Sequence, residues 1–154
     1  MDAQDTVRNW LREISQVAGL GPLTLNENGV GTFSYGEDLT VSIIVPADSE
    51  LVQLLAPLVT RPDENRENYF ARLLELNFLT LETNGATFAL DKESGEVVLC
   101  YSQPVAALES QGFQNLLGGF IETAEKWSGR LGSADFSSAE PVANAESPET
   151  AIRV

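Results

Sequence analysis

The side chains that most often carry out chemistry in proteins are scarce in this sequence. Its 154 residues include no histidine and a single cysteine, Cys100. Without histidine there is no Ser-His or Cys-His pair, and the commonest general base and metal ligand is missing. One cysteine forms neither an internal disulfide nor a zinc–thiolate site, and no glycine-rich phosphate loop occurs. We therefore expect no catalytic residues, no cofactor and no bound metal.

Two acidic stretches are better explained by structure than by chemistry. Residues 91–96, Asp-Lys-Glu-Ser-Gly-Glu, lack the spaced oxygen ligands and closing glutamate of an EF-hand calcium loop. They read as a polar hairpin turn in which Gly95 is free to take a positive φ. Asp63-Glu64 follows Pro62 and suits the first turn of a helix. Carboxylates alone can support glycosidase chemistry, but no pair here differs from a solvated surface.

The net charge of −14 limits the classes of partner. Such a surface repels nucleic-acid backbones and anionic membranes, and it favours basic or neutral partners or simply solubility. No apolar run is long enough to span a membrane. The first ten residues are acidic where a signal peptide is basic. We expect a cytoplasmic protein, with Cys100 as a small buried residue.

Any binding surface must be positioned by helices and strands. The first predicted element is an amphipathic helix over residues 5–18, and it ends at Gly19 and Gly21. Three strands follow, at residues 23–26, 32–35 and 39–45, in which apolar and polar residues alternate. Residues 49–59 fit helical spacing and alternation almost equally, and Pro57 opposes both a helix interior and a central strand.

The second half of the chain predicts a helix over 62–77, a hairpin over 87–101 and a last helix that starts at Pro104. The apolar arc of the 62–77 helix is wide enough to need two apolar neighbours, either within one chain or from a second copy. Gly118 and Gly119 lie off the apolar face of the last helix, at an exposed or closely approached surface. We predict one domain over residues 1–131 and a disordered acidic tail over 132–154, because the tail has almost no large apolar residues.

The order of these elements resembles the CesT (Tir chaperone) family of class I type III secretion chaperones across most of residues 5–130. The resemblance rests on the end of the second helix, on the hairpin and on the last helix. These residues are Leu73, Leu74, Asn77 and Phe78; Leu90, Asp91, Gly95, Val97 and Leu99; and Leu116, Phe120, Ala124 and Trp127. The pattern is mostly apolar spacing, and the family does not require the glycine pair or the tail.

The resemblance implies a fold and a role. The fold is α+β, a single domain in which three helices surround a twisted antiparallel sheet in the order α-βββ(β)-α-ββ-α, with residues 49–59 as an edge-like strand. The role is that of a cytoplasmic homodimer that binds the N-terminal region of a secreted effector or translocated protein in extended form, without ATP. A YbjN-like cytosolic domain with a regulatory role is the alternative within this fold, and a small enzyme or enzyme inhibitor is the alternative outside it.

The expected binding residues follow from this reading. The first helix and the strands after it would form the effector-binding face, with about half of the named residues in the core instead. These residues are Val7, Leu11, Leu25, Phe33, Tyr35, Val41 and Ile43. The second helix and the hairpin would form the dimer interface through Tyr69, Leu73, Leu76, Val97 and Leu99.

Overall fold

The computed structural model of this chain describes residues 1–18, 21–133 and 136. Within them the elements run α1 (Ala3–Ala18), β1 (Val30–Tyr35), β2 (Leu39–Ile44), β3 (Leu51–Thr60), α2 (Arg66–Asn77), η1 (Phe78–Thr80), β4 (Thr87–Leu90), β5 (Glu96–Pro104), η2 (Val105–Ala107) and α3 (Ser110–Leu131). The predicted α+β class, with three α-helices and an antiparallel sheet, is confirmed.

The five strands form one antiparallel sheet in the order β1-β2-β3-β5-β4. Strands β1 and β2 pair from Val30 opposite Ile44 to Tyr35 opposite Leu39, and Gly36 turns between them with φ +66°. β1 and β4 are the edge strands, and β3 and β5 form the longest pairing in the middle.

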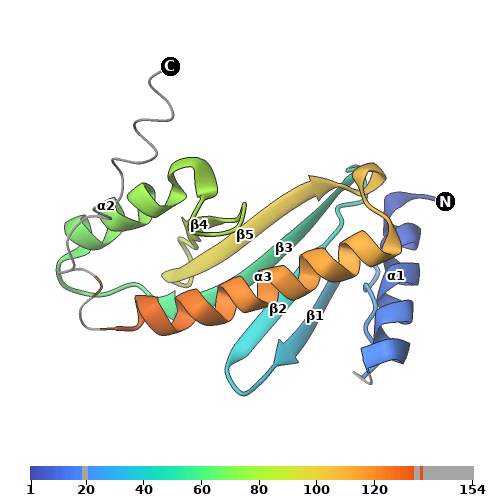
Figure 1. Cartoon of the computed structure of the whole chain (residues 1–154), viewed down its shortest axis with the longest axis horizontal. Helices are drawn as coiled ribbons and strands as arrows, with labels where there is room; N and C mark the ends of the chain where they lie inside the picture. Colours follow the sequence, from blue (N-terminus) through green and yellow to red (C-terminus); the bar gives the residue numbers. More distant parts are fainter. Residues whose placement is uncertain (19–20, 134–135, 137–154) are drawn as a thin grey trace.

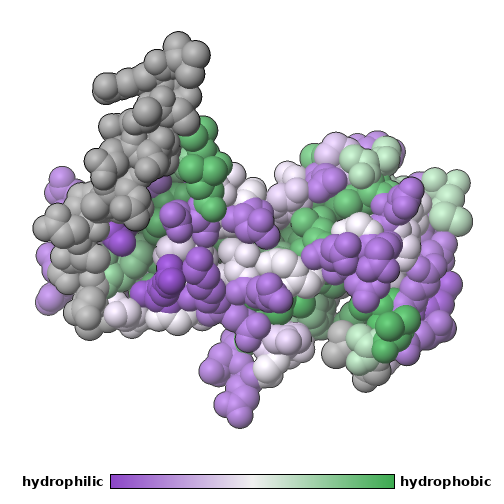
Figure 2. All heavy atoms as spheres, viewed as in Figure 1, coloured by the Kyte–Doolittle hydropathy of each residue, from purple (hydrophilic) through white to green (hydrophobic). Residues whose placement is uncertain are grey.

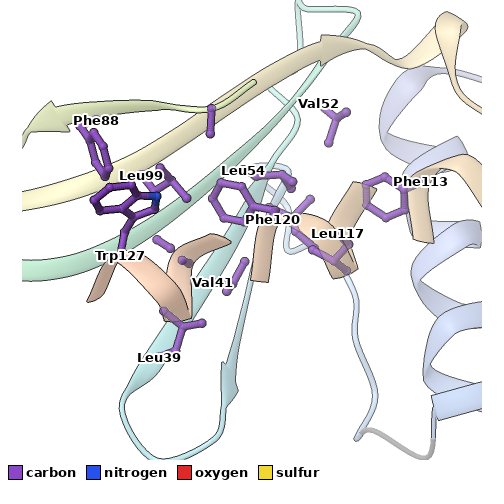
Figure 3. Packing of buried hydrophobic residues seen from close by; sticks show 14 of the residues in the cluster. Leu39, Val41, Val52, Leu54, Phe88, Leu99, Phe113, Leu117, Phe120 and Trp127 are labelled. Carbon is purple, nitrogen blue, oxygen red and sulfur yellow. The ribbon is translucent and has the colours of Figure 1, made fainter. Parts of the chain in front are cut away.

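Helix α3 runs across one face of this sheet, and α1 packs on the same side near its N-terminal end (Figure 1). Because side chains alternate along a strand, every second residue of β2, β3 and β5 faces these helices. Val41, Val52, Leu54 and Leu99 are almost fully buried there. Figure 3 shows them facing one side of α3, whose contribution to this core is Phe113, Leu117, Phe120 and Trp127.

Trp127 closes the core at the C-terminal end of α3. Its ring meets the edge of Phe88 with centroids 5.4 Å apart, and its indole Nε1–H donates to the carbonyl of Glu82 at 3.0 Å. The bond satisfies the one polar group of a side chain that is 3% exposed.

Asn77, the last residue of α2, ties that helix to the outer edge of β4. Its Nδ2 donates to the Phe88 carbonyl at 3.0 Å, and the Phe88 N–H donates to its Oδ1 at 2.7 Å. The amide therefore makes the two bonds that a further strand would make at this point.

One predicted strand is wrong. Residues 23–26 run beside the start of β1 but form no strand, because their bonds close a turn at Val30 and reach α1 instead of forming a ladder. The Leu23 N–H donates to Ser15 Oγ on α1, and Asn26 holds the turn into β1 through its side-chain oxygen and its backbone. The backbone of this segment lies close to β1, because a Cβ on Gly31 would lie 2.5 Å from the Thr24 carbonyl oxygen.

Residues 49–59, which the sequence left ambiguous, include most of β3, and the expectation of an edge-like strand is wrong. β3 lies between β2 and β5 in the centre of the sheet. Pro57 is tolerated there because the register shifts between Pro57 and Val59, and a bulge removes the need for one backbone donor.

Two helices begin later than predicted. α2 starts at Arg66 because Asn65 before it has a left-handed backbone, with φ +54°. Pro104 ends β5 opposite Leu51 instead of starting a helix, and α3 begins at Ser110. Of the glycine pair, Gly118 has no described atom of another element within 4 Å of the position a Cβ would take, whereas Gly119 lies against the Asn84 side chain.

The predicted tail over 132–154 lies mostly outside the described residues. Phe136 is described, and it is buried against α2. Its ring meets Tyr69 edge-on at 5.0 Å and lies under the Arg72 guanidinium at 5.2 Å. Phe136 therefore packs on α2 although it follows residue 131, the predicted end of the domain.

Candidate functional site

A groove lies between α1 and the segment that follows it. Its volume is about 340 Å³, and its lining is Arg8, Arg12, Ser15, Gln16, Pro22, Leu23 and Thr24. Ser15 connects the two walls, since its hydroxyl donates to the Leu11 carbonyl and accepts from the Leu23 N–H at 3.0 Å. Because Thr24 contacts Gly31, the groove lies beside the edge strand β1.

The groove carries positive charge. Arg8 is held in place by bonds to Asp5 Oδ1 at 3.3 Å and to the Asn26 carbonyl at 3.1 Å. Arg12, one helical turn further on, donates to Asn9 Oδ1 at 3.1 Å. These are two of only nine basic residues in the chain.

The outer face of the sheet, away from α1 and α3, is uncharged across its middle. A hollow of about 220 Å³ lies there, and its lining includes Ile44, Gln53, Leu55 and Cys100. Burial raises the pKa of the Cys100 thiol, so the protonated, unreactive form is favoured.

A third surface is strongly apolar. We define the α2–β4 patch as the exposed large apolar residues at the end of α2, in η1 and after it, and at the end of β4. These are Leu74, Phe78, Leu79, Leu81 and Leu90, with exposures of 42% to 70%. Hydrophobic residues are visible at the upper left in Figure 2, where Figure 1 places η1. Exposed apolar area of this kind marks an interaction surface.

The structure places most of the predicted effector-binding residues inside the protein. Val7, Leu11, Leu25, Val41 and Ile43 are at most 5% exposed and belong to the core. At the surface, Phe33 is half-buried, and Tyr35 is 41% exposed at the end of β1.

The predicted dimer residues are likewise buried within the one chain. Tyr69, Leu73, Leu76, Val97 and Leu99 are all less than 9% exposed. The most exposed large apolar side chain of α2 is Leu74, which points away from Leu73 and Leu76.

Sequence reasoning missed the arginines of the groove and most of the α2–β4 patch as sites. The signal for the groove was the i, i+4 spacing of Arg8 and Arg12 on the polar side of α1. The signal for the patch was the mostly apolar segment 78–81, which follows a predicted helix directly and belongs to no predicted helix or strand.

The acidic loop after β4 behaves as a turn. Asp91 Oδ1 accepts the Glu93 N–H at 3.0 Å and the Ser94 N–H at 3.5 Å. These bonds lower the pKa of Asp91. Among the described residues no group of three or more possible ligands is placed to hold a metal ion. No described helix is long and apolar enough to cross a membrane.

Comparison with solved structures identifies close relatives of this fold. The crystal structure of the ExsC-ExsE complex contains a chain that matches with TM-score 0.75 and 26% identity, over 87% of this chain and 99% of that one. The HopA1-SchA chaperone-effector complex matches with TM-score 0.66 and 19% identity, over 82% and 95%. YbjN from E. coli, a putative transcription regulator by its description, matches with TM-score 0.55 and 14% identity, over 80% and 87%. At such identities the last two show a shared fold alone.

The family itself is established by sequence. A search of curated proteins finds no match. The model of the Tir chaperone protein (CesT) family, however, matches residues 9–128, which is most of the chain. It spans α1 from its second turn, the whole sheet and α3 almost to its end. The predicted resemblance is confirmed, and the chain belongs to the Tir chaperone protein (CesT) family.

Proposed function

We propose that this protein is a type III secretion chaperone that binds the N-terminal region of an effector or translocated protein in extended form and keeps it export-competent, without ATP. The observation that carries this proposal is the family match over residues 9–128, together with the similarity to the chain in the ExsC-ExsE complex along 99% of that chain's length. We place its action in the cytoplasm, where a client awaits export.

The surfaces support binding of an extended segment. Among the described strands β1 pairs with β2 alone, so part of its outer backbone can accept another strand. Phe33 and Tyr35 of β1 are accessible beside that edge, and the groove along α1 lies at its start. A client that is unfolded when bound can cover several such surfaces at once.

Affinity capture from the native host tests the proposal. The full chain, immobilised in buffer with EDTA and without ATP, should retain a specific protein through its N-terminal segment. Proteolysis of the complex should leave only the contacted stretch intact, and calorimetry should give a negative ΔCp because apolar surface is buried. Retention of DNA-associated proteins alone would favour the YbjN-like regulatory role instead.

Variants of β1 test where the client binds. Tyr35→Ala and Phe33→Ala should weaken client binding by about 1–4 kcal/mol if both side chains contact it, the range of interface anchors. Leu51→Ala, which removes an exposed side chain elsewhere on the sheet, is the control. If both β1 variants bind the client with wild-type affinity, the client binds at another surface.

We propose further that the protein is a homodimer through the α2–β4 patch. Light scattering should give twice 16.7 kDa. Leu74→Glu or Phe78→Glu should give a folded monomer, because these side chains are exposed within one chain but would be buried, and the new charge unpaired, between two. Val17→Glu, at another exposed apolar residue, should leave the dimer intact. A wild-type monomer at micromolar concentration would contradict the proposal.

A further inference from the structure

The groove beside α1 combines a local positive charge with an apolar wall, on a protein of net charge −14. Leu23 is half-buried in this wall, and Pro22 precedes it. On a surface that repels acidic ligands overall, this groove therefore favours a carboxylate next to an aliphatic side chain.

The two arginines differ in how much of their charge is already used. Arg8 pairs with Asp5 at 3.3 Å. The ion pairs within the described part of the chain are this one and Arg66–Asp63, so Arg12 has no carboxylate partner there. Its guanidinium donates to the neutral amide of Asn9, and the side chain is exposed at the groove. A planar guanidinium with free donors is suited to hold a carboxylate in bidentate fashion.

We propose that the groove binds an acidic residue and a neighbouring aliphatic residue of the client segment, with the carboxylate on Arg12 and the aliphatic side chain on Leu23. This inference rests on the proposed chaperone function and names the chemistry that one of its surfaces recognises. The net charge attracts clients that are basic overall, whereas the groove sets where along the chain they bind.

The groove provides register because a slip of one residue in an extended segment exchanges the two kinds of side chain. An aliphatic group would then face the guanidinium, and the carboxylate would face Leu23 and Pro22. Both changes are unfavourable, so one alignment of the client is selected.

A display experiment tests the proposal. Overlapping segments of about 30 residues, covering the N-terminal regions of all proteins encoded by the native host, are selected on the wild-type full chain and on Arg12→Glu. Wild-type selection should enrich segments with Asp or Glu next to Leu, Ile or Val. The charge-reversed variant should lose these segments and enrich ones with Lys or Arg at the same place.

Binding of one selected segment then measures the contact. Changing its acidic residue to Lys should weaken binding to the wild type by about ten- to hundredfold, the range for hydrogen bonds to charged groups. The same segment should regain at least part of that affinity on Arg12→Glu. Arg66→Glu makes the same change of net charge at an exposed arginine outside the groove, and it should bind the original segment like the wild type.

The failures are distinguishable. If the wild type selects segments without acidic enrichment, or if Arg12→Glu and Arg66→Glu bind them equally, the groove proposal is wrong and the chaperone function stands. If the folded wild-type protein retains no N-terminal segment at all, both proposals are wrong.

Discussion

Trp127 shows how one side chain joins separate parts of the fold. It belongs to α3, contacts Phe88 of β4, and hydrogen-bonds to Glu82 in the turn between η1 and β4. Two cations, Lys126 and Arg130, lie over its ring at 5.4 and 5.2 Å. The apolar spacing of the last helix identified this tryptophan as a core residue, but its bond to a loop 45 residues away is a tertiary fact that the spacing does not contain.

Trp127→Phe should destabilise the protein by about 1–3 kcal/mol, because the Glu82 carbonyl loses its donor and a smaller ring fills the site. Trp10→Phe is the matched control. Trp10 stacks on Phe113 with centroids 5.3 Å apart, and within the described residues its indole N–H makes no bond that phenylalanine would lose. Urea denaturation of the two variants measures the difference; equal losses would show that the bond to Glu82 contributes nothing.

Cys100 should react slowly with alkylating reagents. Burial raises its pKa, and the thiolate is the reacting species, so the folded protein contains less thiolate than the unfolded chain at the same pH. In the unfolded chain the pKa of this thiol is about 8.5. Because the folded-state pKa is higher, the buried neutral thiol stabilises the fold fully below the unfolded pKa. That stabilisation is lost as the pH rises through the folded-state pKa. Iodoacetamide at about pH 8 should modify the native protein more slowly than the urea-unfolded protein. A native rate equal to the unfolded one would contradict this.

At the scale of elements, Asn77 determines how α2 sits on the sheet. Asn77→Asp should destabilise the protein by about 1–3 kcal/mol, because Oδ1 still accepts from Phe88 but an oxygen replaces the Nδ2 donor and faces the Phe88 carbonyl. Asn77→Ala loses both bonds. Asn115→Asp is a suitable control, since Asn115 accepts a bond from Gln111 within α3 and is not part of such a pair. Thermal melts that show no difference between Asn77→Asp and the control would contradict the role of the amide.

Most elements were predictable because their apolar periodicity is regular. The exceptions have local causes that periodicity does not report. Leu23 and Leu25 alternate like a strand, yet the Leu23 N–H bonds to a helix hydroxyl. Pro57 argues against a central strand unless a bulge accommodates it, and the bulge is visible only in the register with β5.

The candidate site was harder to predict than the fold. Periodicity identifies which residues share a face, but burial depends on what packs over that face. Val41 and Tyr35 lie in neighbouring strands with the same alternation, yet Val41 is fully buried and Tyr35 is exposed, because the helices cover only part of the sheet. Leu79 reaches the surface through a backbone with φ +58°, which no apolar pattern predicts.

At the scale of the whole molecule, the folded unit should end at Phe136. Removal of residues 137–154 should leave the melting temperature unchanged, since a segment so poor in large apolar residues adds little to a core. Removal of 132–154 also takes Phe136 away from Tyr69 and should cost about 1–3 kcal/mol. Phe136→Ala in the full chain should reproduce that loss. Equal melting temperatures for both truncations would instead support the boundary at 131.

The amide of Asn77 on β4 has a consequence for how copies of the protein meet. A sheet with two open edges can add copies at both ends and grow into a filament, as in amyloid-like stacking. Here one edge is occupied at Phe88 by a side chain of the same molecule, while at the opposite edge no described side chain caps β1 at Phe33 or Tyr35. Head-to-tail polymerisation needs two complementary open edges, and within the described residues the β4 edge is interrupted at Phe88. If a client adds to β1 as proposed, this asymmetry favours addition of one extended segment at β1 over repeated addition of copies of the chain at both edges.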